Sequence, residues 1–148
     1  MTKDVIVSIS GLQYVIGAGN QEPEPVEVVM AGQYYKKNEK HYLIYDEMMA
    51  GFESSTRNIM KFDDKKMEVR KKGLINVQMI FEENKKNVSY YQTPFGMVNM
   101  GVAATRIKID EQDDIIYVLV DYALDMNESY VADCTIAMTI QAKQSTSA

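Results

Sequence analysis

Residues 66–73, KMEVRKKG, alternate between apolar and charged side chains. Met67 and Val69 share one face with Lys71, and the residues between them are charged. Successive side chains of a β-strand point to opposite faces of a sheet, so this period of two predicts a strand with one buried face and one wet face. The alternation is typical of an antiparallel sheet that covers an apolar core on one side.

The same rhythm recurs along the whole chain and shows no helical period. Short polar turns interrupt it, such as KKNEK at residues 36–40 and DEQDD at residues 110–114. We therefore predict ten strands, near residues 4–16, 26–36, 41–50, 55–62, 66–72, 76–82, 87–93, 97–109, 114–125 and 130–142.

About ten sequential antiparallel strands without a helix have to bury one face, and closing the sheet also removes its aggregation-prone edges. The predicted fold is all-β: a single antiparallel barrel of about 8–10 meandering strands, closed or nearly closed. Its domain spans residues 1–143, and the polar residues 144–148 form a frayed tail.

The predicted interior is rich in methionine, since the chain holds eleven. Flexible thioethers either fill irregular gaps in a core or adapt to an apolar guest. Periodicity does not separate the two, because interior volume depends on strand tilt and shear. The methionines expected to point inward are Met30, Met60, Met67, Met79, Met100 and Met138.

Several short motifs occur in a characteristic order and spacing. They are Gly32 with Tyr34-Tyr35, HYLIYDE (41–47), RKKG (70–73), YQTPFG (91–96) and the closing pair DYAL and DCTIAMTI (121–124 and 133–140). In these the chain resembles the YwiB-like bacterial family, a domain of unknown function with a calycin-like (lipocalin-like) β-barrel. The resemblance implies this fold and brings no established activity, catalytic residue or cofactor.

Candidate ligand-binding residues follow from the inward face of residues 41–47, which holds Tyr45 and Glu47. An inward carboxylate needs a partner, and Lys71 is in line with the inward residues of its own strand. We expect the pair at the barrel mouth, in solvent; the alternative is a polar floor that, with Tyr45, orients the head group of a ligand. Tyr91 completes the candidate set of Tyr45, Glu47, Lys71 and Tyr91.

No catalytic or metal-binding residue is predicted, and no cofactor. His41 follows Lys40 beside a turn expected at Asn38-Glu39, so we expect an exposed histidine without an orienting acid and a nucleophile. The single Cys134 alternates with core residues and reads as a small buried hydrophobe. One cysteine and one histidine are too few for an ordinary structural zinc site.

Charge and cysteine content limit the partners and the location. The net charge is −5 and the lysines are scattered among acids, which argues against a nucleic-acid surface. No run of about 18 apolar residues occurs, so no membrane span is expected. The lone cysteine fits a reducing, cytoplasmic setting.

Two functions remain open. The favoured one is non-catalytic binding of a small apolar or amphipathic molecule inside the barrel; an enzyme is the less favoured reading. The alternative is a protein-interaction or assembly module with a filled barrel, because residues 115–124, IIYVLVDYAL, are apolar on both faces. In that case the outer face of this strand docks a partner or a second copy in a homodimer.

Overall fold

A computed structural model of the chain describes residues 3–15, 24–48, 55–73, 76–93 and 96–143. These residues form ten strands and no helix. The strands are β1 (Lys3–Val15), β2 (Glu24–Lys37), β3 (Lys40–Met48), β4 (Ser55–Phe62), β5 (Lys66–Lys72), β6 (Val77–Glu82), β7 (Lys85–Thr93), β8 (Gly96–Glu111), β9 (Ile115–Met126) and β10 (Ser129–Ala142).

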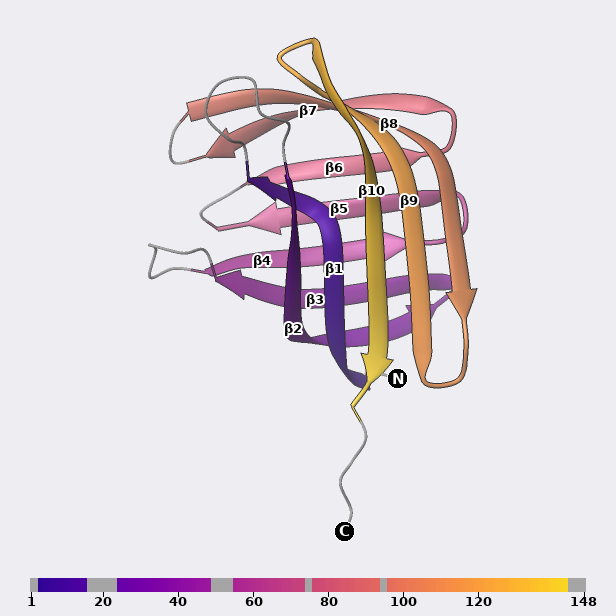
Figure 1. The fold of residues 1–148 in the computed structure, drawn as a ribbon. Coiled ribbons are helices and arrows are strands. Elements are labelled where there is room, and N and C mark those ends of the chain that lie inside the picture. Colours follow the sequence, from indigo (N-terminus) through magenta and orange to yellow (C-terminus); the bar gives the residue numbers. More distant parts are fainter. Residues whose placement is uncertain (1–2, 16–23, 49–54, 74–75, 94–95, 144–148) are drawn as a thin grey trace.

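The strands form one closed antiparallel barrel in which each strand pairs with its neighbours in sequence and β1 pairs with β10 (Figure 1). The predicted all-β, calycin-like meander is therefore confirmed, and its ten segments match the observed strands to within a few residues. The predicted frayed tail, residues 144–148, lies outside the described residues.

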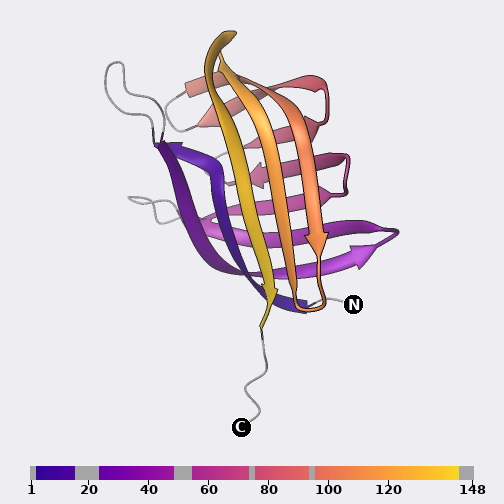
Figure 2. The same cartoon turned by 45° about the vertical axis from the view of Figure 1, so that its right-hand side comes forward.

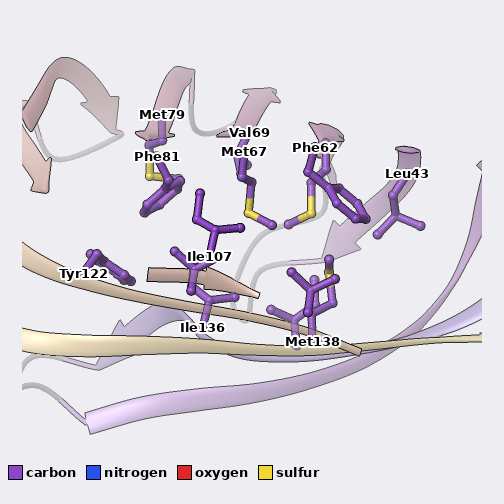
Figure 3. Packing of buried hydrophobic residues seen from close by; sticks show 14 of the residues in the cluster. Leu43, Phe62, Met67, Val69, Met79, Phe81, Ile107, Tyr122, Ile136 and Met138 are labelled. Carbon is purple, nitrogen blue, oxygen red and sulfur yellow. The ribbon is translucent and has the colours of Figure 1, made fainter. Parts of the chain in front are cut away.

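Two walls of side chains meet inside the barrel (Figure 3). Leu43, Phe62 and Phe81 come from β3, β4 and β6, and they face Ile136 and the other core residues of the β8–β10 wall. All four are almost completely buried. This packing is the consequence of the period-two pattern, since each strand contributes its apolar face to the interior.

The predicted inward direction of the methionines is also confirmed. Met60, Met67, Met79, Met100 and Met138 are buried, and Met30 is half-buried against the same core. Their flexible thioethers line the interior between the two walls.

The β2–β3 hairpin forms as the sequence predicts. Asn38 and Glu39 both have positive φ, at 53° and 65°, as a two-residue hairpin turn requires. This turn places Tyr35 opposite Tyr42, and their rings stack with centroids 4.7 Å apart. The aromatic pair therefore helps to fix the register of the hairpin.

Candidate functional site

A polar cluster lies inside the barrel, at the end where β3 and β5 finish and β4 begins. Glu47 and Lys71 project inward from β3 and β5, and Asn58 projects inward from β4 between them. Their exposed fractions are 4%, 3% and 0%. Three polar side chains are thus removed from water within an otherwise apolar core.

Hydrogen bonds within the cluster offset this loss of hydration. Lys71 Nζ donates to Glu47 Oε1 over 2.9 Å and to Asn58 Oδ1 over 2.7 Å. Asn58 Nδ2 donates to Glu47 Oε1 over 3.1 Å and to the carbonyl oxygen of Thr56 over 3.3 Å. The amide joins the two charged groups into one network, in which each hydrogen bond to a charge is stronger than a neutral one.

The expected pairing of Glu47 with Lys71 is correct, but the expected solvent exposure at the barrel mouth is wrong. Both side chains are only 3% exposed. The physical reason is that Asn58 hydrogen-bonds to both side chains, and the buried Val77 is the cross-strand neighbour of Lys71 on β6. The pair is therefore buried, as the alternative interpretation of a polar floor requires.

The cluster keeps hydrogen-bonding capacity that the described residues do not use. The Thr56 hydroxyl is completely buried, and its Oγ1 has no hydrogen-bond partner among the described residues. Lys71 uses two of its three ammonium protons on Glu47 and Asn58. A polar group buried without a partner costs free energy, so this unused capacity calls for a physical explanation.

Tyr45 belongs to the same inward face and is the direct cross-strand partner of Asn58. Burial raises the pKa of its phenol well above the usual value of 10.0, and the nearby Glu47 carboxylate adds to the rise. The hydroxyl therefore stays protonated at every ordinary pH and can serve as a hydrogen-bond donor.

The structure brings together three of the four predicted ligand-binding residues. Tyr45, Glu47 and Lys71 share the cluster, whereas Tyr91 lies in β7 with its backbone paired to Val98 and its side chain outside the description. The sequence analysis missed Asn58 and Thr56. Their signal was present in the alternation of β4, STRNIMKF, which places both on the face of the buried Met60.

His41 lies on the same strand as Glu47 but toward the opposite end of the barrel. Its expected exposure is wrong, since it is 5% exposed and stacks on Phe62 with ring centroids 4.9 Å apart. Its Nδ1 shares a 2.7 Å hydrogen bond with the hydroxyl of Tyr34, and its Nε2 lies 3.7 Å from Glu111 Oε1. His41 follows the turn directly and its side chain lies on the inner face of β3. There it contacts Glu111, which is 70 residues later in the chain.

The stability of the protein is expected to fall as the pH drops below 6.5. Burial lowers the pKa of His41 below 6.5, although Glu111 and Asp63 oppose the shift, which Lys36 reinforces. The unfolded chain therefore takes up a proton at a higher pH than the folded chain does, and folding loses up to about 1.4 kcal/mol per pH unit in that window. Urea unfolding between pH 5 and 7.5 measures the loss.

The variant His41→Gln is the control, because it removes the titrating ring and should flatten this part of the pH profile. The chain has one histidine, so its imidazole resonances in an NMR titration belong to His41 without ambiguity. A midpoint at or above 6.5 would contradict the expectation.

Other predicted features can be placed as well. Cys134 is buried and unpaired, as expected for a small core residue. Across the described ranges, no group of three or more histidine, cysteine, aspartate or glutamate side chains could hold a metal ion. Within those ranges there is also no helix long and apolar enough to cross a membrane.

Comparisons with known proteins address the fold and the family. The domain of unknown function DUF1934 matches residues 9–138. Among solved structures, the chain is similar to the crystal structure of the ywiB protein from Bacillus subtilis, with a TM-score of 0.75 and 19% sequence identity over 97% of this chain and 94% of that chain. The TM-score shows that the two chains share a fold. No curated protein matches the chain.

Proposed function

The chain belongs to the family of the domain of unknown function DUF1934, as its resemblance to the YwiB-like proteins predicted, and we propose that it binds a small amphipathic molecule inside its barrel without changing it chemically. Barrels of about this size either fill their interior with side chains or enclose one small ligand. The polar floor of Glu47, Asn58 and Lys71 supports the second possibility.

The buried Thr56 hydroxyl, which has no hydrogen-bond partner among the described residues, is the observation that carries the proposal. A hydroxyl in an apolar core costs about 1–3 kcal/mol when it is unpaired, and a valine of the same shape would avoid this cost. A ligand group that bonds to Thr56 would remove the penalty. The third ammonium proton of Lys71, which no described residue accepts, offers a second donor for that group.

The surroundings of the cluster define the class of ligand. Val77 pairs with Lys71 in the sheet, and Val69 and Met60 are the next inward residues on β5 and β4. All three are buried and apolar. The expected ligand therefore has a hydroxyl, carbonyl or carboxylate at one end and an apolar body at the other.

A binding role fits this cluster better than catalysis does. A general base needs a substrate proton within hydrogen-bond reach and is commonly oriented by a further group. His41 lies six residues from Glu47, which is about 20 Å along β3. The cluster consequently offers hydrogen bonds and a charge pair that can hold a ligand. We also expect the protein in the cytoplasm.

Thr56→Val is expected to weaken binding of an amphipathic ligand about tenfold without lowering the stability of the protein. The change removes one hydrogen bond to the ligand, worth about 1.4 kcal/mol, and no hydrogen bond within the described part of the protein. Binding of dansylated undecanoic acid is measured by fluorescence titration, and stability by urea unfolding.

Thr105→Val is the matched control, because Thr105 lies on the outer face and should leave binding unchanged. Native mass spectrometry of the protein from its own source provides an independent readout, since a bound molecule would name its chemical class. Equal affinity of the parent and Thr56→Val proteins for the probe would contradict the role of Thr56. An empty native protein that also fails to bind the probe would overturn the proposed function.

A further inference from the structure

The outer face of the barrel carries a groove of about 440 Å³ across β1, β9 and β10, with residues of β2 and β8 at its two sides. These five strands lie side by side in the order β2-β1-β10-β9-β8 (Figures 1 and 2). Small side chains of β1 and β10 form its floor: Ser8, Ser10, Ala137 and Thr139. Larger side chains of β9, Tyr117 and Leu119, stand at one side.

The side chains on the two sides of β10 differ in size at matching positions. On the β9 side of β10, Tyr117 and Leu119 pair with Thr139 and Ala137. On the β1 side, Ser8 and Ser10 occupy the corresponding places beside the same two residues. A bulky strand and a small-residue strand therefore flank β10 at the same two levels.

The two sides of the groove also differ in charge: β8 contributes Lys108 and Asp110, and Asp110 lies beyond Tyr117 and accepts a 3.3 Å hydrogen bond from Gln112. Glu27 of β2 follows Ser10 in one row across the sheet, and Lys108 of β8 ends that row beyond Leu119. Both are exposed. Glu27 accepts a 3.4 Å hydrogen bond from Ser8, and neither Glu27 nor Lys108 forms an ion pair with a described residue.

Neighbouring charges on the outer surface differ in this respect. Arg106, two residues before Lys108, pairs with Asp121 over 3.3 Å. Lys86 pairs with Asp125. Among the described residues, Glu27 and Lys108 thus have no ion-pair partner and remain available to a second molecule.

We infer that this face is the interface between two copies of the chain, related by a two-fold axis that runs along β10 in the plane of contact. Such an axis places β9 of one copy over β1 of the other. Tyr117 then meets Ser8 of the second copy, Leu119 meets Ser10, and Lys108 meets Glu27. Bulky side chains face small ones and opposite charges face each other, as an isologous interface requires.

A second copy fits this face better than an extended peptide does. Each of these five strands pairs with a neighbour on both sides, so the described part of this face has no free strand edge to which a peptide could add. A flat partner must pack face to face, and two sheets do so with their strands nearly aligned. The exposed Ile6 on β1, which is 43% exposed, then meets Ile115 of the second copy and extends the apolar contact.

The test is a charge swap at the two sides of the groove. Sedimentation velocity from about 5 to 500 μM is expected to show a monomer–dimer equilibrium for the parent protein. Lys108→Glu or Glu27→Lys alone places like charges opposite each other and should weaken the dimer at least tenfold. The double variant Glu27→Lys/Lys108→Glu restores opposite charges and should recover the dimer.

Arg70→Glu is the matched control. It makes the same change in net charge as Lys108→Glu, from an exposed position on β5 outside the groove, and should leave the equilibrium unchanged. A parent protein that is monomeric throughout the concentration range would overturn the inference. So would a dimer that tolerates either single reversal, or one that the double variant fails to restore. None of these results depends on whether a ligand occupies the barrel.

Discussion

Lys71→Met is expected to lower the free energy of unfolding by about 3–5 kcal/mol, even though methionine fits the space and the apolar surroundings. The substitution leaves the Glu47 carboxylate buried without its cationic partner, and Asn58 Oδ1 loses its 2.7 Å hydrogen bond. An uncompensated buried charge destabilises a fold far more than the loss of a surface ion pair does. Urea unfolding followed by circular dichroism at pH 7 measures the change.

The double variant Glu47→Leu/Lys71→Met separates the charge from the packing. It removes both charges, so its stability should return to within about 1–2 kcal/mol of the parent protein. Lys72→Met, one residue along β5 with an outward side chain, should change stability little. A single Lys71→Met variant as stable as the parent would mean that the pair is hydrated, contrary to its 3% exposure.

How much of this site the sequence predicts depends on the range of the interactions involved. Alternation along single strands is local, and it correctly placed Glu47 and Lys71 on the inward face. Their depth was not predictable in this way, because it depends on how the curled sheet closes at the end of the barrel. Thr56 and Asn58 were within reach of the same alternation, since they share a face with Met60.

The burial of His41 and the charged sides of the groove could not be predicted from alternation along single strands. His41 is covered by Glu111, and Glu27 falls in one row with Lys108 through four strand pairings. Such contacts between distant residues follow from the register of several strands together. One-residue errors in any strand would invert the faces, so periodicity alone does not determine them.

Gly11→Ala is expected to destabilise the barrel by about 3 kcal/mol or more. Gly11 lies in a bulge of β1, where the pairing with β2 shifts between Ser10 and Gln13, and its φ is +91°. A non-glycine residue in a sparsely populated backbone region costs about 1–3 kcal/mol. An added Cβ would also lie 1.8 Å from the carbonyl oxygen of Thr135 on β10, so the backbone itself would have to move.

The movement would disturb a second contact, because Tyr122 donates a 2.8 Å hydrogen bond to the carbonyl oxygen of Gly11. Gly96→Ala is the matched control: Gly96 has a φ of +126°, but among the described residues, its chain neighbours aside, no heavy atom lies within 4 Å of an added Cβ. The stability that Gly96→Ala loses should reflect the backbone conformation alone. In urea unfolding this loss should be clearly smaller than the loss caused by Gly11→Ala. Equal losses would mean that β1 and β10 can separate at the bulge without cost. The larger loss at Gly11 would instead show that the close approach of these two strands, which closes the barrel, requires a residue without a side chain.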